Sequence, residues 1–104
     1  MSSPDAFRTH LSAENTDRLG QALRLSDELQ SAAPAGDEKL VELRALLDSC
    51  RDGIRRQNPH HRRQRLEAID QARNFLRFLP DMQSSQATGR LRSVSRRLRT
   101  ARRA

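Results

Sequence analysis

The residues best equipped to bind a ligand are the arginines, which outnumber lysine 19 to 1 in this chain of 104 residues. A planar guanidinium group can donate two parallel hydrogen bonds to one phosphate, which an ammonium group cannot do. Residues 1–50 hold five basic and nine acidic groups, net −4, whereas residues 51–104 hold fifteen basic and four acidic groups, net +11. A GC-rich genome explains a high arginine content but not this placement. The asymmetry indicates a polyanionic partner for the second half of the chain.

One arginine cluster lies in the segment RRQNPHHRRQR, residues 55–65. Arg55 and Arg56 suit the end of a helix, where positive charge complements the helix dipole. Arg62 and Arg63 open the next helix, where the dipole is already positive, so their placement costs stability unless an anion lies among them. We expect a phosphate at this turn, and a solvated turn is the alternative. The predicted contacts are Arg55, Arg56, Arg62, Arg63 and Arg65.

A second cluster lies in the predicted basic helix at residues 89–104, GRLRSVSRRLRTARRA. Its apolar residues recur at 3-4-3 spacing and share one side of the helix, which leaves the opposite side to arginine. The predicted contacts there are Arg92, Arg96, Arg99 and Arg103, with Arg97 beside them. The ridge from Arg92 to Arg103 is about 16 Å long, enough for a few consecutive phosphates. The three Phe residues lie on or beside apolar faces, so we expect salt-dependent backbone contacts with little sequence preference.

His60 and His61 carry the catalytic interpretation, because imidazole transfers protons near neutral pH and two histidines can cleave RNA as acid and base. Adjacent residues at the start of a helix point in different directions, however, and no Tyr or Lys accompanies them. We therefore expect no enzyme activity and no catalytic residue. A stacked base, a phosphate contact and an exposed turn remain alternatives for the two histidines.

The chain shows no pattern typical of a metal or cofactor site. His10, Cys50 and the two adjacent histidines lack the paired spacings of zinc ligands. Cys50 falls in a helical apolar stripe, which predicts a buried thiol, and a single cysteine fits a reducing compartment. We expect no metal, no cofactor and no small-molecule substrate.

The elements that position these residues are predicted to be helices. Val, Ile and Thr are scarce, Trp and Tyr are absent, and no segment alternates with period two. The strongest periodic signal is a 3-4-3-4 stripe formed by Leu40, Leu43, Leu47, Cys50 and Ile54. We predict one all-α domain over residues 1–104, a small helical bundle built on an antiparallel hairpin with a basic C-terminal helix.

Three parts make up this domain. An N-terminal helical region spans 1–33, starts at the N-cap sequence Ser3-Pro4-Asp5 and weakens in periodicity near 12–16. The hairpin spans 37–80, with Asn58 capping its second helix and Pro59 in the first turn of that helix. The composition of QSSQATG, residues 83–89, predicts a loop before the basic helix at 89–104.

The acidic first half has two interpretations. Its carboxylates form either a solvated face or a surface that pairs with the basic patches of other subunits, including copies of the same chain. No apolar run approaches the roughly 18 residues that span a bilayer, and the apolar side of the basic helix is thin for a membrane-surface helix. MSSPDAFRTH lacks the regions of a signal peptide. We expect a cytoplasmic protein that does not bind membranes.

Together these features resemble the small helical subunit of multi-subunit CRISPR effector complexes. In that family several copies line up along larger subunits that carry the crRNA, and exposed helices contact nucleic acid through Arg and Lys. The matching residues are Arg55, Arg56, Arg62, Arg63 and Arg65 in the turn and Arg92, Arg96, Arg99 and Arg103 in the last helix. The stretch HHRRQRLEAIDQARNFLRFL is similar to the helical hairpin of a small-subunit ribosomal protein, although the Asp-His-x-x-Ser-Arg pattern of that RNA-binding turn is missing.

The resemblance implies a non-enzymatic subunit of a ribonucleoprotein complex that contacts RNA or single-stranded DNA without sequence preference. Its expected partners are nucleic acid, larger protein subunits and further copies of itself. The alternative from another class is a protein-interaction module, such as a phage or plasmid inhibitor, an antitoxin or an adaptor, whose arginine face binds an acidic protein. A ribosomal-type RNA-binding protein is the alternative within the same class.

Overall fold

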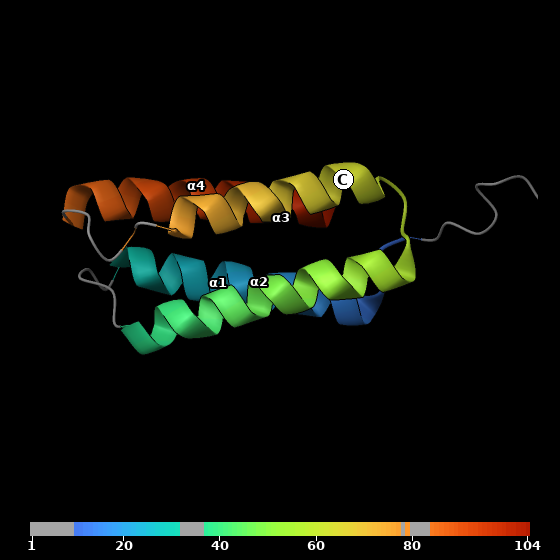
Figure 1. Ribbon diagram of the computed structural model, residues 1–104, viewed down its shortest axis with the longest axis horizontal. Helices are drawn as coiled ribbons and strands as arrows, with labels where there is room; N and C mark the ends of the chain where they lie inside the picture. Colours follow the sequence, from blue (N-terminus) through green and yellow to red (C-terminus); the bar gives the residue numbers. More distant parts are fainter. Residues whose placement is uncertain (1–9, 32–36, 78, 80–83) are drawn as a thin grey trace, which may run out of the picture.

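The computed structural model describes residues 10–31, 37–77, 79 and 84–104, and these residues form helices without any strand (Figure 1). The helices are α1 (Ala13–Ser31), α2 (Asp37–Gln57), α3 (Arg62–Leu76) and α4 (Ser84–Arg103). The prediction of an all-α small helical bundle is confirmed.

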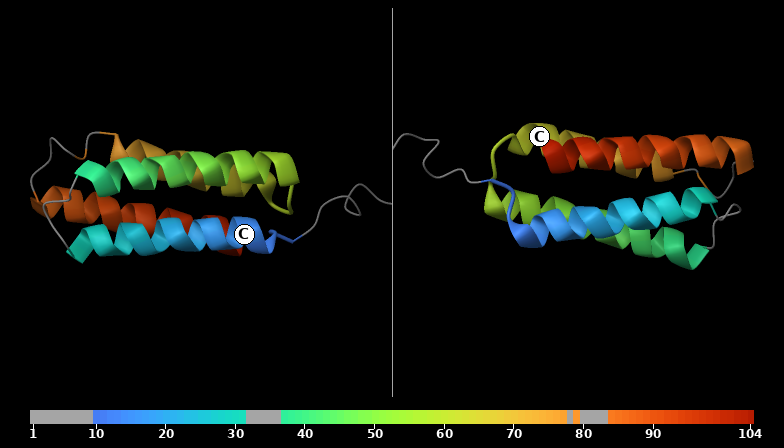
Figure 2. Two further views of the ribbon diagram at one scale, coloured as in Figure 1. Left: turned by 90° about the horizontal axis from the view of Figure 1, so that it is seen from below. Right: turned by 180° about the vertical axis from the view of Figure 1, so that it is seen from behind.

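Successive helices run antiparallel, so that the bundle goes up, down, up and down. Each helix contacts two neighbours, and α4 closes the ring by contacting α1 as well as α3. Figure 1 is seen from the side formed by α2 and α3, whereas the right panel of Figure 2 is seen from the side formed by α1 and α4. The α2–α3 side and the α1–α4 side are therefore opposite sides of the bundle.

A single apolar core fills the space between the helices. All five residues of the predicted stripe on α2 are buried, as are the four predicted apolar residues of α4, Leu91, Val94, Leu98 and Ala101. In α1, Leu19, Ala22 and Leu29 are buried as the periodicity indicates, and Leu25 joins them. Burial of these side chains is the main driving force that holds α4 against the rest of the bundle.

The first described helix begins at Ala13, inside the segment where the apolar periodicity weakens. Ser12 is its N-cap, because the Ser12 hydroxyl accepts a hydrogen bond from the backbone N–H of Asn15 at 3.1 Å. From Ala13 onward α1 is continuous, so the weakened periodicity near 12–16 marks a helix start. The predicted N-cap at Ser3-Pro4-Asp5 lies outside the described residues.

The prediction that Asn58 caps α3 is wrong. Asn58 has a φ of 54°, in the left-handed region, and its N–H bonds to the carbonyl of Ile54 at 3.0 Å, so it ends α2. Asn tolerates this conformation better than most residues, and the buried Pro59 that follows cannot continue a helix. The N-cap of α3 is His61, also left-handed with φ 57°, and its side chain makes no capping hydrogen bond.

Two further boundaries differ from the prediction. The third helix ends at Leu76 with Arg77 as its C-cap, short of Pro80. The predicted loop at 83–89 is wrong from residue 84 on, because α4 begins at Ser84. Ala87 packs against the core. A Cβ at Gly89 would meet nothing within 4 Å, so no close contact requires glycine there, although glycine costs a helix about 1 kcal/mol relative to alanine.

Candidate nucleic-acid interface

The arginine ridge of α4 is exposed as the helical spacing predicts. We use the name α4 ridge for Arg92, Arg96, Arg99 and Arg103, all of which are exposed. The helix holds seven arginines and no acidic residue. Arg99 forms an ion pair with Asp27 of α1, Nη2 to Oδ2 at 3.6 Å, so the ridge leans toward α1 and belongs to the α1–α4 side. Arg97, half-buried, lies beside the ridge.

Buried polar contacts fix the position of α4 against α1. Ser26 and Ser95 are buried, and their hydroxyl oxygens lie 2.9 Å apart. Ser26 donates to the carbonyl of Leu91 at 3.1 Å, and Ser95 donates to Oδ1 of Asp27 at 2.7 Å. Gln30 donates to both Asp27 and Ser95, at 3.1 and 2.9 Å. Because these bonds join particular residues of α1 to particular residues of α4, they hold the two helices in one register and so fix the position of the ridge.

Arg65 is the clearest correction to the predicted contacts. Its exposed fraction is only 4%, and burial lowers the pKa of its guanidinium group because desolvation disfavours the charged form. Nε donates to the carbonyl of His60 at 2.8 Å, and Nη1 donates to those of Ala101 and Arg102 at 2.5 and 3.2 Å. Nη2 donates to the carbonyl of Ala104. Arg65 therefore caps the C-terminal end of α4 and is not available to a phosphate.

The anchor at Arg65 brings the two arginine clusters to one end of the bundle. The start of α3, the end of α4 and the end of α2 all lie there (Figure 1). Arg55 and Arg56 are exposed in the last turn of α2. Arg62 is half-buried and Arg63 is exposed in the first turn of α3, where Arg63 pairs with Glu67 at 3.4 Å. Four predicted contacts thus surround the end at which the α4 ridge terminates.

The histidines lie at this same end but do not converge on one point. The rings of His10 and His60 meet edge to face with centroids 5.8 Å apart, while His61 is exposed at the N-cap of α3. Among the described residues no three His, Cys, Asp or Glu side chains gather closely enough to hold a metal ion.

Cys50 is fully buried in the core, as its place in the stripe predicts. Burial raises the pKa of its thiol to about 11, although the positive charge of Arg18 acts in the opposite direction. The thiol is therefore protonated at neutral pH and takes no part in the basic surface.

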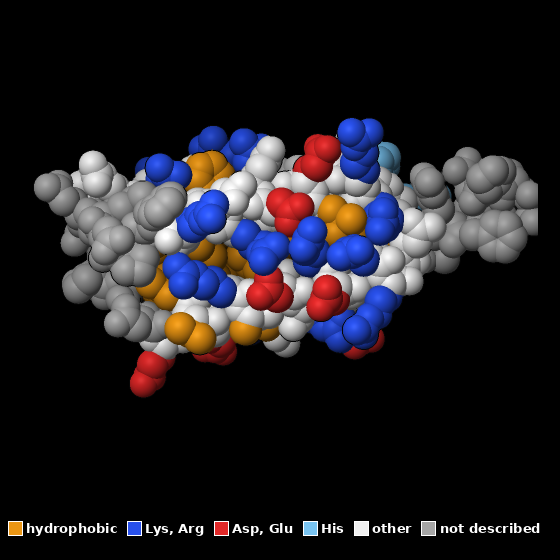
Figure 3. Space-filling view, viewed as in Figure 1, with side chains coloured by type: hydrophobic (Ala, Val, Ile, Leu, Met, Phe, Trp, Pro, Cys, Tyr) orange, Lys and Arg blue, Asp and Glu red, His pale blue; other side chains and the backbone are white. Residues whose placement is uncertain are grey.

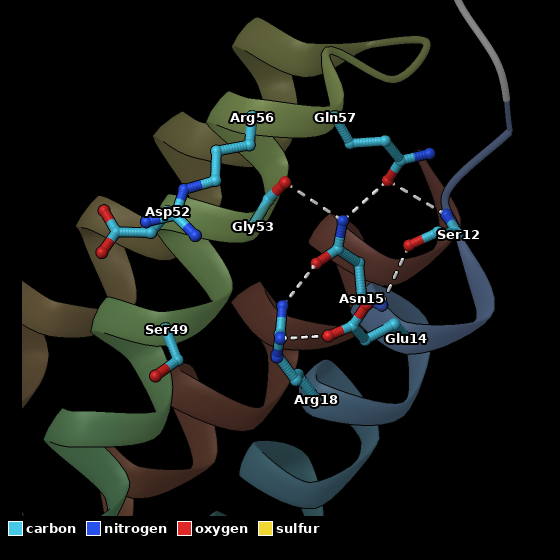
Figure 4. A pocket seen from close by; sticks show the side chains of 9 residues that line it. All are labelled: Ser12, Glu14, Asn15, Arg18, Ser49, Asp52, Gly53, Arg56 and Gln57. Carbon is cyan, nitrogen blue, oxygen red and sulfur yellow. Dashed lines mark hydrogen bonds and ion pairs between the residues drawn. The ribbon is translucent and has the colours of Figure 1, made fainter.

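A polar cleft between α1 and α2 was not visible in the sequence (Figure 4). The side-chain amide of Asn15 donates to the carbonyl of Gly53 at 3.2 Å and to the amide oxygen of Gln57 at 2.7 Å. The same oxygen of Gln57 accepts from the N–H of Ser12 at 3.1 Å. A Cβ at position 53 would lie 2.2 Å from Oδ1 of Asn15, so only glycine permits this contact. These bonds join the start of α1 to the end of α2, beside the basic end.

Some carboxylates of the acidic first half, for which a solvated face and a subunit interface are the two interpretations, are engaged in contacts within the bundle. Asp27 is held by Ser95, Gln30 and Arg99, and Glu28 pairs with Lys39 at 3.9 Å. Glu38 and Glu42 remain exposed on α2.

Sequence reasoning also missed a row of charges between α2 and α3. Arg44, Asp48 and Arg51 of α2 face Asp70 and Arg73 of α3 across a groove. The signal was present, because these residues recur at helical spacing with opposite charges on the two helices of a predicted hairpin.

No protein-family model, curated protein or solved structure matches this chain. None of the helices in the described ranges is long and apolar enough to cross a membrane.

Proposed function

We propose that the protein is a non-enzymatic nucleic-acid-binding subunit of a ribonucleoprotein complex, and that the α4 ridge and the basic end contact phosphates of RNA or single-stranded DNA. This is the class of function that the likeness to the small subunit of CRISPR effector complexes implies. The likeness to a ribosomal-type RNA-binding protein leads to the same chemistry.

The observation that carries the proposal is the unbalanced charge of α4. Within the described part of the chain, Arg92, Arg96 and Arg103 have no ion-pair partner. Like charges four residues apart on a helix destabilise it by a few tenths of a kcal/mol per pair. Phosphates along the ridge remove this repulsion, and each neutralised phosphate releases counterions.

Contact with phosphates rather than bases follows from the same surface. Among the described residues the one Phe is Phe75, which is half-buried under Arg90, whose guanidinium carbon is 5.6 Å from the ring centre, so it presents no exposed ring to the ridge. Phosphate contacts position a nucleic acid without reading its sequence. We therefore expect similar affinities for strands of different sequence.

The outer face of α2 is available for contact with larger subunits or with further copies of the chain. Glu38, Glu42 and Asp52 are exposed there without an ion-pair partner among the described residues, next to the exposed Val41. This face and the α4 ridge belong to helices on opposite corners of the ring. A neighbouring subunit on α2 would thus leave the ridge open to nucleic acid.

Filter binding with single-stranded RNA and DNA of several sequences tests the proposal. The double variant Arg92→Ala and Arg96→Ala should weaken binding of every sequence about tenfold at low salt, because it removes two phosphate contacts. The matched control is Arg18→Gln with Lys39→Gln, which removes the same charge from the α1–α2 side and should weaken binding much less.

Equal losses for the two double variants would assign binding to net charge rather than to the ridge. A loss confined to one sequence would indicate base readout. A wild-type protein that ignores nucleic acid and forms a stoichiometric complex with an acidic protein would replace the proposal by the interaction-module alternative.

A further inference from the structure

A groove of about 570 Å³ separates α2 from α3 on the side of the bundle opposite the α4 ridge. Lys and Arg side chains, blue in Figure 3, gather along this groove. The charged residues that line the groove are Arg44, Asp48, Arg51, Asp70, Arg73 and Arg77. Four arginines against two aspartates give the groove a net charge of +2. None of these arginines belongs to the clusters considered above.

The two aspartates hold the arginines in place. Nη2 of Arg73 lies 3.0 Å from Asp48, and Nη1 lies 3.5 Å from Asp70. Nε of Arg51 lies 3.2 Å from the same oxygen of Asp70, as an ion pair without hydrogen-bond alignment. The carboxylate of Asp70 is thus shared between two guanidinium groups. Two arginines are fixed in this way at positions from which they face the groove.

The arginines keep donors to spare. Nη2 of Arg44 donates to the carbonyl of Leu76 at 2.9 Å, which satisfies the end of α3. A guanidinium group carries several N–H donors, and the contacts described use one or two on each of Arg44, Arg51 and Arg73. Arg44 and Arg73 are exposed and Arg51 is half-buried, so these side chains reach the solvent that fills the groove. Fixed guanidinium groups with open donors bind an anion with a smaller loss of side-chain entropy than mobile ones.

We propose that the α2–α3 groove is a second phosphate-binding surface, and that one copy of the protein holds two nucleic-acid segments at once, one on each side of the bundle. This inference rests on the proposed function, because it assigns the same ligand chemistry to a second surface. The two surfaces face away from each other across the ring of helices, with the core between them. A strand seated on the ridge therefore leaves the groove free for another strand.

A bridging assay tests the inference. Biotinylated oligothymidylate is held on beads, the full chain is added, and a fluorescent oligothymidylate is then supplied as the second strand. Wild-type protein should retain the fluorescent strand on the beads at low salt, and retention should fall steeply as salt rises.

The discriminating variant is Arg44→Gln with Arg77→Gln, which leaves the contacts of Asp48 and Asp70 in place. Binding of one strand should stay within twofold of the control variant Arg18→Gln with Lys39→Gln, whereas retention of the second strand should fall at least tenfold below that control. The melting temperatures of both variants, followed by circular dichroism, report whether each remains folded. If the double glutamine variant unfolds, Arg44→Lys with Arg77→Lys is used, which keeps the charge but loses the paired donors and should reduce retention severalfold.

The outcomes separate the two proposals. If wild-type protein binds neither strand, the proposed function fails. If it binds the first strand and never retains the second, or if the groove variant and the control retain the second equally well, the inference about the groove is overturned while the proposed function stands. The last result would assign bridging to association between copies of the chain.

Discussion

On the α1–α4 side the helices are joined by hydrogen bonds of two buried serines, one of which donates to the carboxylate of Asp27, whereas on the α2–α3 side they are joined by half-exposed ion pairs. Ser26 and Ser95 are almost completely buried, and their bonds are about 3 Å long. Arg73 and Asp70 of the other side are 40% and 45% exposed. Buried hydrogen bonds are costly to break because water cannot replace the lost partner, but exposed ion pairs are screened by water and salt.

On one side of the bundle polar residues join the helices and arginines are left for a ligand, whereas on the other side arginines do both. The network of Ser26, Ser95, Gln30 and Asp27 holds α4 in register without using the arginines of α4, except Arg99, which pairs with Asp27. The ridge therefore keeps its charge for an external anion. On the α2–α3 side the arginines help to join the helices and present their spare donors at the same time.

The largest expected effect is that of Ser95→Val, which breaks the α1–α4 network. The substitution removes the three hydrogen bonds of Ser95, to Ser26, Gln30 and Asp27, and places an apolar side chain against the buried hydroxyl of Ser26, so we expect a loss of about 2 kcal/mol in the free energy of unfolding. Urea unfolding at low and high salt measures it, and the loss should be the same at both. A loss that disappears in high salt would mean that the network acts as an ion pair.

The buried thiol of Cys50, in the core between the two sides, makes the free energy of unfolding depend on pH. Since burial raises the pKa of Cys50 from 9.0 to about 11, the folded state keeps the thiol proton that the unfolded state releases. This contribution to stability is complete below pH 9 and is lost as the pH rises to 11, on the order of 2 kcal/mol. The chain has no Tyr and one Lys, so few other groups titrate in this window.

Unfolding free energies of wild type and Cys50→Ala between pH 8 and 11 measure this contribution. The wild-type curve should fall over the window and the curve of the variant should stay nearly flat. Parallel curves would show that the thiol is not what titrates.

The smaller effect belongs to the α2–α3 side. Arg73→Ala removes two half-exposed ion pairs, to Asp48 and Asp70, and should lower the free energy of unfolding by less than about 1 kcal/mol. High salt should reduce this loss further, because the wild-type pairs are themselves screened. If Arg73→Ala destabilised the protein more than Ser95→Val, the contrast between the two sides would be wrong.

The smallest effect is expected for the histidines, which belong to neither side. Neither His60→Ala nor His61→Ala should change the affinity for oligonucleotides by more than about twofold, because phosphate contact depends on the arginines around them. Any RNA-cleaving activity that disappears in either variant would restore the catalytic interpretation. Competition filter binding and an RNA stability assay provide the two measurements.

The helical core was predictable because apolar spacing alone determines it. The apolar stripe of α2, which begins at Leu40 and ends at Ile54, and that of α4, which begins at Leu91 and ends at Ala101, are buried as their periodicity requires. The start of α4 was not predictable, since Ser, Gln, Thr and Gly favour loops locally and only contacts with the rest of the bundle stabilise the helix there. Asn58 and His61 adopt left-handed conformations that sequence composition does not distinguish from an N-cap.

The candidate site was predicted in part. The exposure of Arg92, Arg96 and Arg103 follows directly from the position of the apolar stripe on α4. The burial of Arg65 could not be inferred, because it depends on the end of α4 lying beside the start of α3, thirty-six residues away in sequence. The charges of the α2–α3 groove could be read from their helical spacing on the two helices of the predicted hairpin, but the groove itself required knowledge of which faces of α2 and α3 meet.

The dependence of affinity on salt tests the central claim most directly. The measurement is the equilibrium constant of the wild-type protein for a single-stranded oligonucleotide between about 50 and about 200 mM salt. Four phosphate contacts along the α4 ridge alone predict a slope of log K against log salt of about −3, since each contact on a single strand contributes about −0.7, and contacts at the basic end make the slope steeper. A slope near zero, or no binding at low salt, would contradict the assignment of the ridge to nucleic acid.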